Sequence, residues 1–143
     1  MARVRVKARA LIWIDRRLIV AEQYRQGRRE LSLPGGRVNA RESVHEALRR
    51  EVAEETGLEV DPGRLVYISE VVESVRTHDL ELIFLAESRG VPQLRRFRTI
   101  DLNAGERPPV RPPILDLIAG DIAAGWRDTP RWLGNLARPA AAE

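Results

Sequence analysis

The fold is decided by residues 33–58, which read LPGGRVNARESVHEALRREVAEETGL. The stretch opens with a proline and two glycines, which interrupt regular secondary structure. The pattern then becomes helical: Asn39 is a good N-cap residue, and Glu42 three residues later completes a capping-box pattern. We therefore predict a helix over residues 40–56, ended by a left-handed C-cap at Gly57.

Three glutamates share one face of this predicted helix. Glu51, Glu54 and Glu55 lie at positions i, i+3 and i+4, and they continue the apolar stripe that faces the core. Clustered carboxylates repel one another and lose hydration when they are partly buried. A divalent cation such as Mg²⁺ or Mn²⁺ removes this penalty, because it binds carboxylate oxygens. The alternative is a solvated helix whose acidic groups are screened by neighbours such as Arg50.

Outside this stretch, short β-rich segments surround one further helix. Residues 3–14 alternate apolar and basic side chains, which is typical of a strand with one buried face. We predict strands at 3–14, 18–21, 31–33, 64–74, 79–87 and near 94–100, turns at 15–17 and 76–78, a polar loop over 25–30, and a helix from 112 to Gly125. This order predicts one α/β (α+β) domain over residues 1–135, followed by a flexible tail over 136–143.

The composition excludes several classes of protein. The 143 residues contain no cysteine, so thiol catalysis and cysteine-ligated metals are excluded. The net charge is +3, and because 21 acidic residues nearly balance the basic ones, nucleic acid is not the expected partner. Lys7 is the only lysine, and most of the arginines are expected to be solvated. No apolar run is long enough for a membrane span or a signal peptide, which favours a cytoplasmic protein.

The spacing within residues 36–58 resembles a complete Nudix box. Every position that the family's pattern defines is occupied: Gly36, Glu42, Arg50-Glu51-Val52, Glu54-Glu55 and Gly57-Leu58. The resemblance implies a Nudix-type α/β/α sandwich, in which a mixed central sheet carries the box helix. It also implies divalent-metal-dependent hydrolysis of a pyrophosphate bond in a nucleoside diphosphate derivative.

Roles for individual residues follow from the same resemblance. Glu51, Glu54 and Glu55 match the family's metal-binding carboxylates, and Gly36 matches the glycine whose carbonyl adds a metal ligand. Arg50 matches the arginine that orients the glutamates through charge-assisted hydrogen bonds. The catalytic set is therefore Glu54, Glu51, Glu55 and Arg50, with Mg²⁺ or Mn²⁺ as cofactor. We favour Glu54 as the general base.

The substrate is less well encoded than the metal site. A nucleoside triphosphate and an ADP-ribose-like or nucleotide-sugar-like metabolite are both open, with Arg37 and Arg25 expected to contact it. Basic residues 5, 7 and 9 of the first strand face either a phosphate pocket or solvent, and we expect solvent for two of the three. An acid outside the box that takes part in the chemistry is sought among Asp79, Glu81, Glu87 and Glu106.

Two further hypotheses compete with the enzyme. One is a catalytically silent Nudix domain that binds a nucleotide and regulates a partner; the intact set of Arg50 and three glutamates argues against it. The other is an arginine-rich module that binds nucleic acid, whose affinity would fall steeply with salt. Many relatives dimerise, which leaves a homodimer open.

Overall fold

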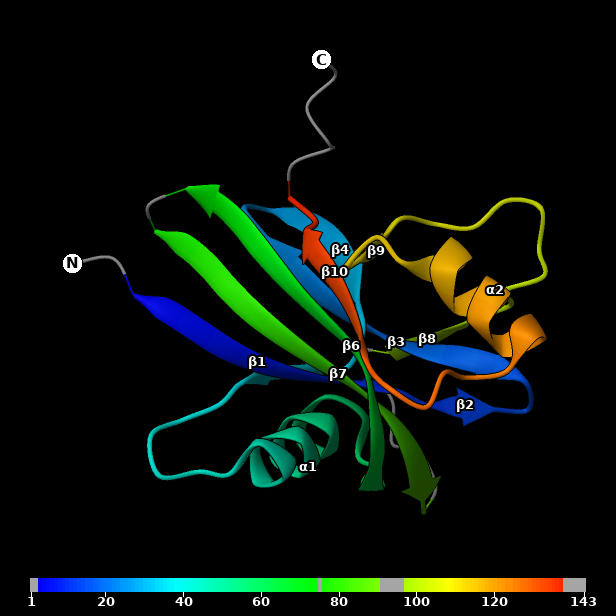
Figure 1. The fold of residues 1–143 in the computed structure, drawn as a ribbon, viewed down its shortest axis with the longest axis horizontal. Helices are drawn as coiled ribbons and strands as arrows, with labels where there is room; N and C mark the ends of the chain where they lie inside the picture. The colour runs from blue at the N-terminus through cyan, green and yellow to red at the C-terminus, as the bar shows by residue number, and fades with distance from the viewer. Residues whose placement is uncertain (1–2, 75, 91–96, 138–143) are drawn as a thin grey trace.

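The described part of the chain forms two β-sheets and two helices (Figure 1). The computed structural model describes residues 3–74, 76–90 and 97–137. The helices are α1 (Val44–Thr56) and α2 (Leu115–Ala124). The strands are β1 (Val4–Leu11), β2 (Trp13–Ile14), β3 (Arg17–Arg25), β4 (Arg28–Ser32), β5 (Gly35–Arg37), β6 (Glu59–Ser74), β7 (Thr77–Arg89), β8 (Phe97–Ile100), β9 (Val110–Arg111) and β10 (Arg131–Asn135).

The first sheet is mixed and has the strand order β10-β6-β7-β1-β5. Strand β1 runs parallel to β7 and antiparallel to β5, and β6 runs antiparallel to β7. The second sheet has the order β2-β3-β4-β9, and β8 pairs with β3. The predicted mixed sheet with the box helix packed on it is confirmed.

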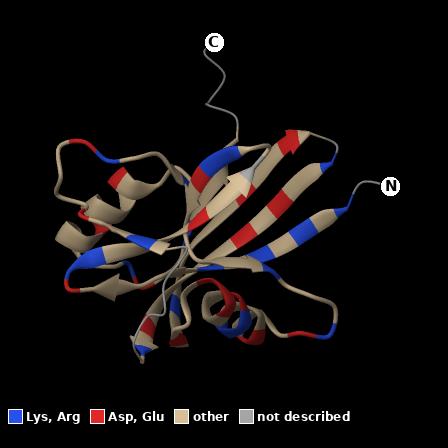
Figure 2. Ribbon diagram, turned by 180° about the vertical axis from the view of Figure 1, so that it is seen from behind, with Lys and Arg blue, Asp and Glu red and all other residues tan. Residues whose placement is uncertain are grey.

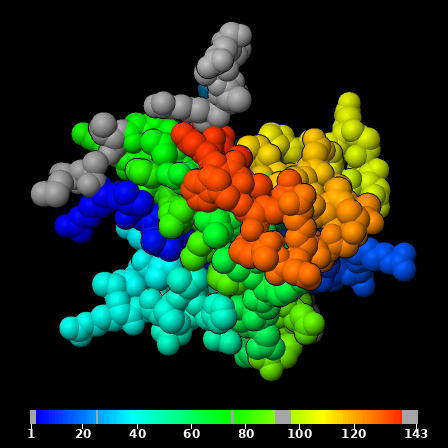
Figure 3. Space-filling model, viewed as in Figure 1, coloured from blue at the N-terminus to red at the C-terminus, as the bar shows by residue number. Residues whose placement is uncertain are grey.

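Each face of the first sheet covers a separate hydrophobic core, because β1 alternates its side chains. Ala8 and Ala10 point toward α1 and pack with Leu48 and Val52. Leu11 points to the opposite face, where residues of the second sheet and α2 form the other core. The two helices therefore lie on opposite sides of the molecule, α1 in the cyan region of Figure 3 and α2 in the orange region.

The box helix starts later than its sequence predicts. Ser43, not Asn39, is the N-cap, and its side chain forms a reciprocal capping box with Glu46. Glu42 does accept a hydrogen bond from the Asn39 amide at 3.0 Å, but this pair closes a turn that precedes the helix. The predicted end is correct, since Gly57 adopts a left-handed conformation with φ of 73°.

Several strand boundaries also differ from the predictions. The expected strand over 3–14 is split into β1 and β2, which belong to different sheets. The expected loop over 25–30 is the tip of the β3–β4 hairpin, which turns at Gln26 and Gly27. Gly35 and Gly36, expected to end a strand, form β5. The strands expected at 64–74 and 79–87 are longer, so Thr77 and His78 belong to β7 instead of a turn.

The C-terminal part of the chain adds a strand that the sequence pattern does not reveal. Strand β10 pairs in parallel with β6, and Leu136 beyond it donates its amide to the Glu70 carbonyl. Residues 138–143 of the expected tail, and residues 94–96 of the strand expected near 94–100, lie outside the described residues. No helix in the described ranges is both long and apolar enough to cross a bilayer.

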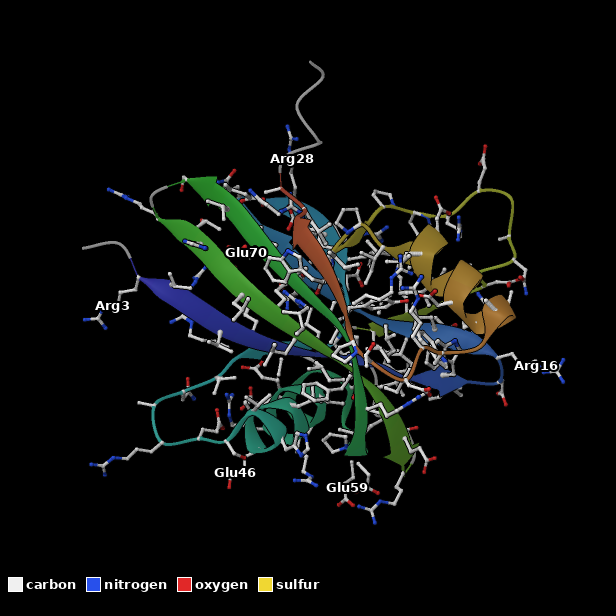
Figure 4. All side chains as sticks on the ribbon, viewed as in Figure 1. Arg3, Arg16, Arg28, Glu46, Glu59 and Glu70 are labelled. Carbon is white, nitrogen blue, oxygen red and sulfur yellow. The ribbon has the colours of Figure 1, made fainter. Side chains whose placement is uncertain are left out.

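Many charged side chains surround the fold without entering it. Arg3, Arg16 and Glu46 lie at the periphery in Figure 4 and point away from the body. This fits the expectation that most arginines are solvated.

Candidate active site

The two glycines of β5 bring the backbone against the carboxylates of α1. A Cβ atom on Gly36 would lie 2.5 Å from the Cδ atom of Glu51, so only glycine fits while that carboxylate stays in place. A Cβ on Gly35 would lie 2.0 Å from the Ala8 carbonyl oxygen, and its φ of 137° is strained for any other residue. The Gly35 amide donates to Glu55 Oε2 at 3.1 Å. The glycines thus form a cradle for two glutamates.

Arg50 binds three of the four glutamates near this cradle. We call Glu42, Arg50, Glu51, Glu54 and Glu55 the carboxylate cluster. The Arg50 guanidinium makes a bidentate pair with Glu42, at 2.7 Å from Nε and 2.9 Å from Nη2. Nη1 donates to Glu51 at 3.0 Å and to Glu54 at 3.5 Å. The bond from Arg50 lowers the pKa of Glu42 to about 2, so Glu42 stays ionised.

Glu55 has the opposite environment. Burial raises the pKa of its carboxyl to about 7, although the Gly35 amide and the charge of Arg9 act to lower it. The nearby charges of Glu51 and Glu54 raise it further. In the metal-free protein, this carboxyl is therefore half-protonated near neutral pH.

The chemistry of these groups fits a divalent cation. Carboxylate and carbonyl oxygens are the ligands that Mg²⁺ prefers. Glu51 lies against Gly36, and Glu55 is bonded to the amide of the adjacent Gly35. Burial disfavours the charged form of the Glu55 carboxyl and raises its pKa, and a bound cation would stabilise that charged form. Within the described ranges, however, no three acidic or histidine side chains converge closely enough to hold an ion, since Arg50 draws Glu51 and Glu54 toward itself.

A cavity of about 800 Å³ lies on the face of the first sheet that points away from α1. Figure 2 shows the basic stripes of β1 beside acidic stripes on neighbouring strands. We call this cavity the strand pocket. The charged residues of β1 and β7 that line it are Arg5, Lys7, Arg9, Asp79 and Glu81. Asp79 pairs with Arg5 at 2.7 Å and Lys7 at 3.1 Å, and Arg9 pairs with Glu81 at 2.8 Å. Prolines 108, 109, 112 and 113 and Leu31 add apolar surface.

The structure brings together some of the predicted site residues and separates others. Glu51, Glu54, Glu55, Arg50 and Gly36 form one group around the cradle. Arg37 is exposed, and its carbonyl accepts a hydrogen bond from Arg50 at 3.0 Å. The backbone of Arg25 ends β3, but its side chain lies outside the described part of the structure.

The acidic and basic candidates outside the Nudix box differ in whether they line the pocket. Of the four candidate acids, Asp79 and Glu81 line the pocket, while Glu87 and Glu106 are exposed and do not. The basic side chains of residues 5, 7 and 9 all line it, so the expectation of solvent for two of them is wrong. The alternation of basic and apolar residues along β1 indicates that the three basic side chains share one face of the strand. It does not indicate that the second sheet covers this face.

Comparison with known proteins decides the family. The profile described as "NUDIX domain" matches residues 4–106, which is most of the chain. The chain belongs to the Nudix family. The complete box predicts a hydrolase, and hydrolases of this family generally use divalent metals.

Individual relatives agree with this assignment. The human 8-oxo-dGDP phosphatase NUDT18 is 37% identical over 76 residues, which are 53% of this chain and 22% of that protein. The chain therefore corresponds to only a small part of that relative. The MutT Nudix hydrolase from Burkholderia pseudomallei has a TM-score of 0.69 at 23% identity, covering 81% of this chain and 97% of that one. An ADP-ribose pyrophosphatase from Streptococcus suis has a TM-score of 0.65 at 21% identity, covering 92% and 98%. These two similarities show the fold alone.

Proposed function

We propose that this Nudix hydrolase cleaves a pyrophosphate bond in a nucleoside diphosphate derivative, with water as the attacking group and Mg²⁺ or Mn²⁺ as cofactor. The observation that supports it is the cradle, in which Gly36 leaves space only for the carboxylate of Glu51. A divalent ion held by Glu51, Glu54, Glu55 and the Gly36 carbonyl would neutralise charge on the phosphate oxygens.

Arg50 and Glu54 have different roles in this proposal. Arg50 orients Glu51 and Glu54 through Nη1 and is itself fixed by the bidentate bond to Glu42. Glu54 is the general base in this proposal, because its side chain is 59% exposed and its one hydrogen bond to Arg50 is long, at 3.5 Å. Such a carboxylate is free to accept a proton from water.

The strand pocket and its apolar surroundings would take the nucleoside part of the substrate. A volume of about 800 Å³ suits a nucleotide-sized ligand, and proline and leucine surfaces suit a base. The names of the relatives point to two substrate classes, an oxidised purine nucleotide for the human protein and ADP-ribose for the streptococcal one. Arg37 and Arg25 are proposed to contact the substrate.

A panel of nucleotides tests this function directly. Nucleoside triphosphates, nucleoside diphosphates, ADP-ribose and nucleotide sugars are incubated with Mg²⁺ or Mn²⁺, and released phosphate, pyrophosphate and nucleoside monophosphate are measured. We expect turnover that needs the metal and falls at least about 100-fold in Glu54→Gln and in Glu55→Gln. Glu59→Gln, an exposed change on β6, serves as the matched control.

Two results would count against the proposal. Equal turnover in Glu54→Gln, Glu55→Gln and Glu59→Gln would exclude the box glutamates from the chemistry. Tight, metal-dependent nucleotide binding without any turnover would favour the silent regulatory domain instead.

A further inference from the structure

Arg9 is the basic residue that joins the strand pocket to the carboxylate cluster. Its side chain is only 9% exposed and is fixed by two acceptors. Nε donates to Glu81 Oε1 at 2.8 Å, and Nη1 donates to the Leu33 carbonyl at 2.9 Å. A buried guanidinium held at two of its nitrogens has one orientation, so its remaining N–H groups are aimed in advance.

Those remaining groups are available to a ligand. Within the described ranges, Nη2 of Arg9 donates to no protein atom, although the residue lines the pocket. Arg9 is also close to Glu55, because Arg9 pairs with Gly35 in the register of β1 and β5, and the Gly35 amide donates to Glu55 Oε2 at 3.1 Å. Gln23, which also lines the pocket, donates to Glu55 Oε1 at 3.4 Å. The pocket and the glutamates therefore adjoin at Arg9 and Gln23.

We propose that Arg9 binds the diphosphate group of the substrate where it passes from the strand pocket to the glutamates, and that Glu81 is the residue that positions Arg9. This inference rests on the proposed function, because it takes the scissile diphosphate to lie at the carboxylate cluster. Arginine suits the task, since its planar fork donates two parallel hydrogen bonds to phosphate oxygens.

The surroundings of Glu81 support a positioning role. The residue is 3% exposed, and its Oε2 atom has no hydrogen-bond partner in the described part of the chain. Ser69, directly opposite Glu81 on β6, is fully buried and its hydroxyl has no partner either. Burying a carboxylate with an unused oxygen is costly, so the Arg9–Glu81 pair contributes little to stability. Its clear effect is to fix the direction of the Arg9 guanidinium.

The first test measures binding of inorganic pyrophosphate to the full chain by calorimetry in excess Mg²⁺. This probe carries the diphosphate without a base, so it reports on Arg9 whatever the nucleoside is. We expect Arg9→Gln to weaken binding about 10- to 100-fold, as for other lost charge-assisted hydrogen bonds. Arg9→Lys should remain weakened, because one ammonium cannot contact Glu81, the Leu33 carbonyl and a phosphate together. Arg17→Gln, an exposed arginine bonded to Thr99, should bind like the wild type.

The second test separates positioning from structure by comparing two changes at Glu81. Glu81→Ala should weaken pyrophosphate binding nearly as much as Arg9→Gln, because Nε loses its acceptor. Glu81→Gln keeps an acceptor oxygen and should restore binding to within about threefold of the wild type. A purely structural role predicts instead that binding follows the melting temperature in all variants. If Glu81→Ala does not fold, the Arg9→Lys and Glu81→Gln measurements still decide the question.

The outcomes distinguish this inference from the proposed function. Turnover in the nucleotide panel together with Arg9-independent pyrophosphate binding, or with no pyrophosphate binding by the wild type, overturns the role of Arg9 alone. Arg9-dependent binding with no turnover of any nucleotide overturns the hydrolase proposal alone.

Discussion

The carboxylate cluster and the charged lining of the strand pocket are both networks of acidic and basic side chains, but they are assembled differently. In the carboxylate cluster, Arg50 reaches partners that lie one, four and eight residues away in sequence. In the strand pocket, the partners Arg9 and Glu81 are 72 residues apart and meet only because β1 pairs with β7. The first network is built from α1 and the residues just before it, whereas the second depends on the whole sheet.

The two networks also differ in how many of their polar atoms have a hydrogen-bond partner in the protein. Arg50 uses all three of its nitrogens on protein acceptors. Arg9 leaves Nη2 without a protein acceptor among the described residues, and Glu81 leaves Oε2 without a donor. A network whose donors and acceptors all have protein partners holds its side chains in place, whereas one with unpaired donors can bind a ligand. This difference supports the proposed roles, in which Arg50 orients the glutamates and Arg9 contacts the substrate.

The largest expected effect comes from a change that breaks both networks at once. Gly35 lies between them, with the Ala8 carbonyl on one side and the Glu55 carboxylate bound to its amide. An alanine there would meet backbone at 2.0 Å, so β5 must move away from β1. We expect Gly35→Ala to lower the free energy of unfolding by at least about 3 kcal/mol, as measured by urea denaturation.

Gly105→Ala is the matched control, because nothing lies within 4 Å of the added Cβ. It should change the free energy of unfolding by no more than about 0.5 kcal/mol. Similar losses in the two variants would show that the close approach at Gly35 is not important.

A change of pH should test the buried end of the carboxylate cluster. The pKa of Glu55 is about 7 in the folded protein, against 4.5 for an ordinary glutamate. Because the folded state binds the proton more tightly, this group's contribution is fully present below pH 4.5 and is lost as the pH rises through 7. In metal-free buffer, the wild type should lose about 2 kcal/mol more stability between pH 5 and pH 8 than Glu55→Gln does.

Urea denaturation of both proteins at the two pH values, with a chelator present, measures this difference. Equal pH dependence in the two proteins would mean that Glu55 titrates normally. Adding Mg²⁺ at pH 8 should stabilise the wild type more than the variant.

Substitution of two adjacent arginines tests the role of Arg50 in the carboxylate cluster. Arg50→Gln removes the groups that orient Glu51 and Glu54, and we expect kcat/KM to fall about 10- to 100-fold, as for other residues that support metal ligands. Arg49→Gln removes the same charge from an exposed position next to it and should leave kcat/KM unchanged. If both variants lose activity equally, the effect is one of general charge and not of orientation.

The sequence predicts the carboxylate cluster better than the strand pocket, because the first is formed by residues close in sequence and the second by residues far apart. Helical periodicity alone places Glu51, Glu54 and Glu55 on one face. Glu51 and Glu55 lie against the glycines of β5, and Glu54 is bonded to Arg50. The pairing of Arg9 with Glu81 could not be predicted, because it depends on the register between β1 and β7. Alternation in a strand shows which side chains share a face, but it does not show what covers that face.

The errors in the fold have similar physical causes. The polar stretch over 25–30 lacks the apolar alternation of a buried strand, yet it forms the tip of a hairpin in which residues 26–29 are exposed. Gly35 and Gly36 are poor strand residues, yet they form β5 because only they allow the close approach to β1 and α1. Propensity is overridden at both places by contacts with distant elements.

The smallest expected effect concerns the start of the box helix, whose N-cap is Ser43 and not the predicted Asn39. The Ser43 hydroxyl accepts a hydrogen bond from the Glu46 amide at 3.1 Å, whereas Asn39 contributes backbone groups to the turn before the helix. Ser43→Ala should therefore cost about 1 kcal/mol of unfolding free energy, and Asn39→Ala should cost almost nothing, because alanine keeps the amide. The opposite order in urea denaturation would restore Asn39 as the cap. It would also move the helix start toward Glu42, so that the bidentate bond to Arg50 would become a contact within the helix and not one between the helix and the preceding turn.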